Sequence, residues 1–207
     1  MKRVFAITFF IAAPAFGFTN QIDFSMGRGS PLDSIQAQGS SEQDGLRGSY
    51  WSLDALHHAS DRFYLGFGTG HFSSADNNSS TFAAHTNSTI SSHKTPLMIL
   101  GRMDFGAESH FVPYAIVGLG WVKNSLTVTS DQGTLIDQSK STLGYSGGLG
   151  MDIILGDRLL VGLEARYEGS PAQHFAMTSL GAAASGQTDV HTSINLFSVG
   201  LKAGVRY

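Results

Sequence analysis

The C-terminal stretch, residues 197–207 with the sequence FSVGLKAGVRY, decides the fold. Bulky or apolar residues alternate with small or charged ones at every second position, and this period of two predicts a β-strand with two chemically different faces. One face carries Phe197, Val199, Leu201, Ala203, Val205 and Tyr207, and the other carries Ser198, Gly200, Lys202, Gly204 and Arg206. The strand therefore lies between an apolar and a polar environment.

The same alternation recurs along the rest of the chain and predicts eight strands in all. In one further stretch, residues 111–122, both faces are apolar, so a strand is predicted there without a phase. The other six stretches cover residues 22–27, 50–55, 63–70, 97–105, 143–153 and 159–168.

The connections between these strands alternate strictly in length. Short, turn-rich segments at residues 57–61, 106–110 and 156–158 follow the second, fourth and sixth strands. Long polar segments at residues 29–46, 71–94, 123–140 and 169–192 follow the first, third, fifth and seventh. In an antiparallel array, every long segment then lies at one end. The pattern predicts an all-β protein: an eight-stranded antiparallel up-and-down transmembrane β-barrel.

The side of the barrel on which the apolar face lies is a separate question, because a soluble barrel would turn that face inward around a ligand. Two observations favour the opposite arrangement. The polar face is rich in glycine and carries charges of both signs, which suits a crowded closed interior. Aromatic residues stand near the predicted strand ends, as at membrane interfaces: Trp51, Phe63, Tyr145, Tyr167 and Tyr207.

The composition excludes several classes of protein. Of 207 residues, only 14% are charged and 42% are hydrophobic, with a net charge of −3, so neither a disordered polyelectrolyte nor a basic nucleic-acid-binding protein is expected. Cysteine is absent, which excludes disulfides and thiolate metal sites. No stretch is long and apolar enough for a mature membrane-spanning helix.

The N-terminus has the pattern of a secretory signal peptide rather than that of a buried helix. Lys2 and Arg3 precede a short apolar run, and small residues follow at Ala13-Pro14-Ala15 or Ala15-Phe16-Gly17. We expect a signal peptide over residues 1–17, cleaved after Ala15 or Gly17, and a barrel domain over residues 18–207.

Three local motifs resemble the small bacterial outer-membrane β-barrel family, which includes OmpA-like, OmpX-like and opacity-type surface proteins. The motifs are the aromatic-ended final strand, the stretch PYAIVGLG at residues 113–120 and the stretch LEARY at residues 163–167. The family more often ends in Phe, so Tyr207 is a mild departure.

The resemblance implies a place in the bacterial outer membrane, with extracellular loops and both termini in the periplasm. It implies contact with outer-membrane lipid and lipopolysaccharide, and recognition of Tyr207 as an assembly signal by the barrel-assembly machinery. On fold alone it says little about activity.

Charged residues on the polar faces should form a network in the lumen. The core of this network is expected to be Glu164, Lys202, Arg102, Arg166 and Asp104, and further inward charges are Asp23, Asp54, Asp152, Glu168 and Arg206. If Leu159 pairs with Tyr207, Glu164 lies opposite Lys202. The network either plugs the interior or lines a narrow pore with Lys202, Glu164 and Arg102 at its constriction, and the room inside eight strands favours the plug.

Histidine and serine residues offer little further chemistry. His71, His85 and His93 share one long connection, but their spacing matches no compact ligand motif, so solvated histidines and no metal or cofactor are expected. His191-Thr192-Ser193 faintly resembles the His-x-Ser element of outer-membrane lipid A deacylases. No acidic residue follows Ser193, and Asp189 or Glu168 would have to substitute, so no catalytic residues are expected.

The long connections are then either the functional surface, because binding residues concentrate on loops that a rigid scaffold displays, or polar segments that only solvate the outer end of the barrel. The leading prediction is a surface binding, adhesion or envelope-structural protein, with a host or surface ligand as a possible partner. A narrow passive channel is the alternative, and a lipid-modifying enzyme is the third. Residues 125–129, rich in Ser and Thr, are predicted to extend a strand and to offer an edge for strand addition.

Overall fold

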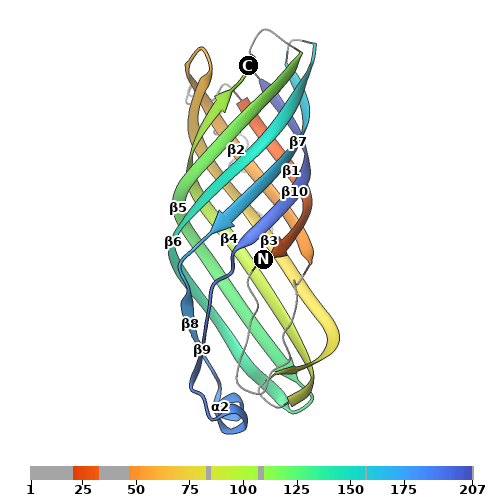
Figure 1. The fold of residues 1–207 in the computed structure, drawn as a ribbon, viewed down its shortest axis with the longest axis vertical. Coiled ribbons are helices and arrows are strands. Elements are labelled where there is room, and N and C mark those ends of the chain that lie inside the picture. Colours follow the sequence, from red (N-terminus) through yellow and green to blue (C-terminus); the bar gives the residue numbers. More distant parts are fainter. Residues whose placement is uncertain (1–20, 33–46, 83–84, 107–109, 157, 207) are drawn as a thin grey trace, which may run out of the picture.

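The chain forms a closed antiparallel β-barrel, as predicted (Figure 1). The structure is a computed structural model and describes residues 21–32, 47–82, 85–106, 110–156 and 158–206, so the predicted signal peptide and Tyr207 lie outside the described residues. Each barrel strand pairs with its neighbours in sequence, and the last strand closes on the first. The eight strands are β1 (Gln21–Pro31), β2 (Gly48–Ser60), β3 (Phe63–Phe82), β4 (His85–Asp104), β5 (Phe111–Ser130), β6 (Gly133–Leu155), β7 (Leu159–Gly169) and β10 (Leu196–Arg206).

The apolar face of each strand points outward. Leu119 and Leu201 are each more than 60% exposed although they stand in mid-strand, whereas the alternating positions are buried in the lumen. This inverted arrangement suits a barrel surrounded by lipid. Within the described ranges, no helix is long and apolar enough to cross a membrane.

The phase of β5 follows from its pairing with β4 and β6. Val112, Tyr114 and Ile116 face the lumen and are almost fully buried, and Phe111, Val117 and Trp121 face outward. The period-two pattern could not assign these faces because both are apolar.

Two of the predicted long connections are strands. Residues 71–82, 85–94 and 123–140 belong to the hairpins β3–β4 and β5–β6, whose four strands are 20 to 23 residues long, against 11 to 13 for β1, β2, β7 and β10. The physical reason lies in inward apolar residues such as Ile90, Leu126 and Val128, which give these hydroxyl-rich segments a face to bury. The wall is consequently much taller on this side.

The fourth long connection folds into a cap at the same end of the barrel (Figure 1). The cap is defined as residues 170–195 and contains a two-stranded sheet of β8 (Gln173–Ala176) and β9 (Asp189–Thr192), with the short helix α2 (Ser179–Ser185) between them. The Thr178 side chain accepts a hydrogen bond from the Gly181 N–H and so caps α2. Neither the hairpin nor the helix was predicted.

The cap buries a second hydrophobic core above the lumen. Phe175 and Val190, one from each cap strand, are fully or almost fully buried. They pack in one cluster with inward residues of the tall hairpins and with the end of the cap, namely Ile90, Leu126, Val128, Leu135, Ile136 and Ile194. A second packed core therefore lies at the long-connection end, between the cap and strands β4, β5 and β6.

Candidate functional site

The first of two ionic clusters in the lumen centres on Arg102, whose side chain is inaccessible to solvent. The Arg102 guanidinium donates to Asp104 at 2.7 Å and to Asp152 at 2.7 Å, and it lies 3.3 Å from Asp23. Lys202 Nζ approaches the same Oδ2 atoms, at 2.7 Å from Asp152 and 3.2 Å from Asp23. Two buried cations thus share two buried carboxylates, an arrangement that compensates the desolvation of each.

The second cluster centres on Arg166 of β7. Its guanidinium donates to Asp54 of β2 across the lumen, and its Nε lies 2.9 Å from Glu164 Oε1. All three side chains are at most 5% exposed.

Tyr114 connects the two clusters and was not predicted as a site residue. Its hydroxyl donates to Glu164 at 2.8 Å. The Arg102 guanidinium carbon and Lys202 Nζ lie 3.8 and 4.0 Å from the centre of its ring, within the range of cation–π attraction. Gly150 pairs with Tyr114 across β5 and β6. A Cβ at position 150 would lie 2.3 Å from the Tyr114 ring, so any residue other than glycine would displace the ring.

The expected pairing of Glu164 with Lys202 is wrong. Leu159 pairs with Val205 rather than with Tyr207, so Glu164 lies opposite Gly200, and Gly162 lies opposite Lys202. A shift of two residues keeps every side chain on its face, so the period-two pattern cannot detect it. Lys202 consequently belongs with Arg102, and Glu164 belongs with Arg166.

The remaining predicted inward charges lie at the two ends of the lumen. Arg206 Nη2 lies 3.3 Å from Asp104 near the short-turn end, where its side chain is 26% exposed. Glu168 is buried near the long-connection end, and its backbone carbonyl accepts from Lys94 Nζ at 2.8 Å.

Apolar side chains fill the lumen beside these charges. Leu56 and Leu100 are 1% and 0% exposed. They form one core cluster with Tyr64, Met98, Tyr114, Ile116 and Val122. Arg102, Asp152 and Lys94 are also at most 1% exposed. The geometry is that of a packed interior.

Lys94 fastens the cap to the barrel and was missed in the sequence, because it falls in a segment predicted as loop. Lys94 Nζ donates to the carbonyl of Glu168 before the cap and to that of Ile194 at its end, both at 2.8 Å. Asn124 adds hydrogen bonds to Ser170 and Gln173 at 3.1 and 3.0 Å. Both ends of the cap are thus held against β4 and β5.

Of the three histidines predicted to be solvated in one loop, His71 and His93 lie instead on strands β3 and β4. Their rings stack at 5.7 Å, and His71 Nδ1 lies 3.1 Å from Thr95 Oγ1. The side chain of His85 lies outside the described residues. Across the part of the chain that the structure describes, no group of three or more His, Asp or Glu side chains is arranged to hold a metal ion.

The His191–Ser193 element does not acquire the predicted substitute carboxylate. Asp189 Oδ2 lies 2.9 Å from His174 Nδ1, and the His191 ring stacks on His174. Ser193 Oγ accepts from Asn195 at 3.2 Å. Asp189 therefore orients His174 rather than His191.

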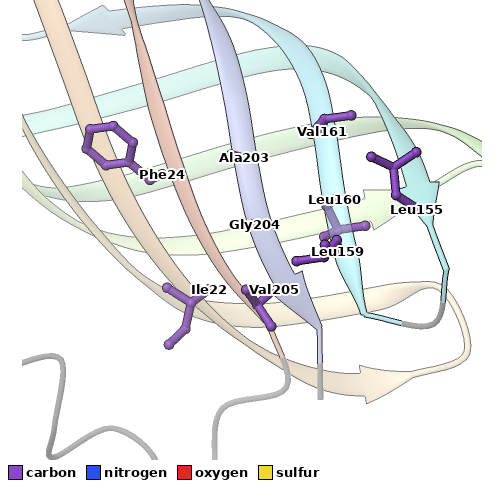
Figure 2. A pocket seen from close by; sticks show the side chains of 9 residues that line it. All are labelled: Ile22, Phe24, Leu155, Leu159, Leu160, Val161, Ala203, Gly204 and Val205. Carbon is purple, nitrogen blue, oxygen red and sulfur yellow. The ribbon is translucent and has the colours of Figure 1, made fainter.

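A shallow apolar hollow of about 300 Å³ lies on the outer face of the barrel near the short-turn end (Figure 2). It surrounds the small side chain of Ala203, between side chains of β1, β7 and the end of β6. Its lining is Ile22, Phe24, Leu155, Leu159, Leu160, Val161, Ala203, Gly204 and Val205. On a lipid-facing wall, such a hollow is part of the surface that acyl chains contact.

The predicted free edge at residues 125–129 is also wrong, because β5 pairs with β4 on one side and with β6 on the other. The edge belongs to β6. Its pairing with β7 ends at Tyr145, and no described strand pairs with its residues 134–144 on that side. The cap contacts part of this edge, since Thr178 N donates to the Leu135 carbonyl at 2.8 Å and Ala176 N donates to Gln138 Oε1 at 3.0 Å.

Fold and exposed faces together define a transmembrane β-barrel of the small outer-membrane class. A family model for the outer membrane protein beta-barrel domain matches residues 5–203, and the chain belongs to this family. Its place is therefore the bacterial outer membrane, where its apolar wall contacts lipid. No curated protein sequence is significantly similar to this chain.

Solved structures share the fold at low identity. OprG, an outer membrane protein from Pseudomonas aeruginosa, is 14% identical with a TM-score of 0.55 over 92% of this chain and 98% of its own. Neisserial surface protein A is 14% identical with a TM-score of 0.53 over 92% and 97%. The outer membrane protease OmpT from Escherichia coli is 9% identical with a TM-score of 0.50 over 91% and 96%. These likenesses concern the fold alone.

Proposed function

We propose that this barrel is a surface-binding protein whose long-connection end faces the cell exterior and whose lumen is closed. The observation that carries the proposal is the edge of β6 over residues 139–144, which no described strand pairs with and which lies beyond the cap contacts at Leu135 and Gln138, on a wall that rises beyond the neighbouring strand β7. An unpaired strand edge is a template for an extended partner segment, which adds to the sheet through main-chain hydrogen bonds.

The direction of the backbone groups along this edge follows from one hydrogen bond. Ile154 N donates to the carbonyl of His110, which precedes β5, and the register of β6 with β5 is unbroken from Ile136 to Ile153. Because backbone groups alternate between the two sides of a strand, odd-numbered residues of β6 direct their N–H and C=O away from β5. Ser139 and Ser141 therefore present these groups at the free edge.

The orientation and the closed lumen have separate support. Long connections face outward in barrels of this class, and the extended wall is rich in hydroxyl side chains rather than apolar ones. The polar clusters and the apolar core cluster fill the interior, and the cap packs against β4, β5 and β6 at its long-connection end. Binding at the rim, rather than passage through the lumen, is the activity that this geometry supports best.

The test is retention of bacteria that display the protein on arrays of immobilised matrix proteins and serum proteins, with albumin as blank. Ser139→Pro removes one N–H from the free edge and leaves the β5 ladder intact. Ser139→Ala is the matched control, since it keeps the N–H. We expect Ser139→Pro to lower retention at least tenfold and Ser139→Ala to retain it. Retention no better than that of cells without the barrel would refute surface binding, and normal retention by Ser139→Pro would refute docking at the edge.

The closed lumen is tested by single-channel conductance of the refolded barrel in a planar bilayer, after a gel shift between boiled and unboiled samples has shown that it is folded. We expect no discrete steps. Steps that Lys202→Ala or Glu164→Ala alters would favour the channel instead.

A further inference from the structure

The outer face of the cap hairpin carries two histidines and a carboxylate side by side. His174 of β8 and His191 of β9 are register partners, and their rings stack at 4.3 Å with an interplanar angle of 12°. Asp189, also on β9, lies with its Oδ2 2.9 Å from His174 Nδ1. All three residues are exposed, while Phe175 and Val190 on the opposite face are anchored in the second core.

The contact with Asp189 indicates which nitrogen of the His174 ring carries the hydrogen in the neutral form. An ionised carboxylate only accepts hydrogen bonds, so Nδ1 carries the hydrogen. In the neutral ring, Nε2 is then a free lone pair directed away from the carboxylate. A carboxylate behind an imidazole in this way fixes the ring and raises its basicity as a metal ligand.

We propose that His174 and His191 form an open binding site for a divalent transition metal of the Cu²⁺, Ni²⁺ and Zn²⁺ class, with Asp189 as the residue that positions His174. Imidazole nitrogen is the donor that these ions share, and Cu²⁺ binds tightest in the general order of stability. Two protein ligands leave the remaining positions to water or to a donor from a partner. The site is independent of docking at the β6 edge.

The two side chains are near enough to reach one ion, but their rings must rotate out of the stack to bind it. At metal–nitrogen distances of 2.0–2.1 Å, two nitrogens bound tetrahedrally to one ion lie about 3.3 Å apart, and each lone pair must point at the ion. In the stacked pair the ring centres lie 4.3 Å apart and the rings are nearly parallel, so binding requires rotation of the two exposed side chains about their χ angles.

The second stacked pair, His71 and His93, lacks these properties and serves as the comparison. Its ring centres are 5.7 Å apart, and the two residues are diagonal rather than direct partners, since His71 faces Thr95 in the β3–β4 hairpin. His71 Nδ1 contacts a hydroxyl rather than a carboxylate. A metal should therefore distinguish the two pairs.

Metal binding at this hairpin would also join the two strands of the cap. Each strand has only four residues, and a short two-stranded hairpin is marginally stable by itself. An ion held by one histidine from each strand binds only the paired arrangement, so it stabilises that arrangement. Protection of the cap from proteolysis is thus a second readout.

The experiment titrates the refolded barrel, prepared without a polyhistidine tag, with Cu²⁺ and Zn²⁺ by calorimetry and follows Cu²⁺ by electron paramagnetic resonance. We expect one site per barrel with two nitrogen ligands, and a spectrum that shows one nitrogen in His174→Ala or His191→Ala, with affinity at least tenfold lower. Asp189→Asn should keep both nitrogens and bind about 10–100-fold more weakly.

The control is the double variant His71→Ala/His93→Ala, which should bind as the wild type does. Absence of stoichiometric binding would overturn the proposal, as would unchanged affinity in both His174→Ala and His191→Ala. Wild-type affinity of Asp189→Asn would overturn the positioning role of Asp189. Gel shift and trypsin cleavage within the cap, each with and without Zn²⁺, establish that every variant is folded.

Discussion

Asp152 is the residue whose replacement should test the lumen network most directly. Its carboxylate is fully buried and accepts from Arg102 and from Lys202, each at 2.7 Å. Asp152→Asn keeps the shape of the side chain and removes the charge, so two buried cations lose the oxygen that they share and retain their longer contacts with Asp23.

The expected loss of unfolding free energy is about 3–5 kcal/mol. Hydrogen bonds to charged groups contribute roughly 1.5–3 kcal/mol each, and two of them are weakened here. Removing one partner of a buried ion pair costs about 3–5 kcal/mol, because the remaining charge stays desolvated. The two figures agree, and the amide oxygen of Asn, which can still accept one bond, places the loss near the lower end.

The assay is urea unfolding of the barrel in phospholipid vesicles, followed by the fluorescence of Trp51 and Trp121 and by the gel shift. Asp131→Asn, in the exposed turn between β5 and β6, is the matched control and should change stability by less than about 0.5 kcal/mol. In a double-variant cycle, Lys202→Met added to Asp152→Asn should cost at least about 1 kcal/mol less than it does alone. A loss below about 1 kcal/mol for Asp152→Asn would refute the shared carboxylate.

Three further predictions concern the wall, the packing and the assembly of the barrel. Leu201→Lys, on the lipid-facing side, should destabilise the refolded barrel by about 2–4 kcal/mol, and unchanged stability in lipid would contradict the outward assignment of this face. Gly150→Ala should cost about 1–3 kcal/mol in the same unfolding assay, because its Cβ collides with the ring of Tyr114, and the same substitution should cost less than about 0.5 kcal/mol in a Tyr114→Leu background. Deletion of Tyr207 should lower the amount of barrel assembled in the outer membrane, measured by surface labelling, and normal surface levels would argue against an assembly role for this residue.

The packed lumen and the rim of the barrel have different roles. The lumen holds the wall rigid, and the rim carries the proposed binding sites. The clusters around Arg102 and Arg166 join β1, β2, β4, β6, β7 and β10 across the interior. Such cross-links hold the wall rigid. The β6 edge and the cap hairpin are therefore already ordered before a partner binds, so binding does not incur the entropic cost of ordering them.

The sequence by itself determined the number of barrel strands, their antiparallel order and the lipid-facing sides of all of them except β5. Each of these depends on the local alternation of apolar and polar residues and on the turn residues between strands. Both can be recognised in short stretches of sequence. The final strand shows this most clearly, since Leu201 and Lys202 belong to opposite faces whatever their partners are.

Only the tertiary structure decided which charges meet. A two-residue shift of β10 against β7 preserves every face and yet moves Lys202 from Glu164 to Asp152 and Asp23, because ion pairing depends on register and on the path across the lumen. The tall hairpins and the cap could not be predicted from the sequence for a related reason. Their strands are stabilised because Phe175 and Val190 are buried against Ile90 and Leu126, which come from segments far apart in the chain. Contacts of this kind form only in the folded barrel, so no local sequence pattern indicates them.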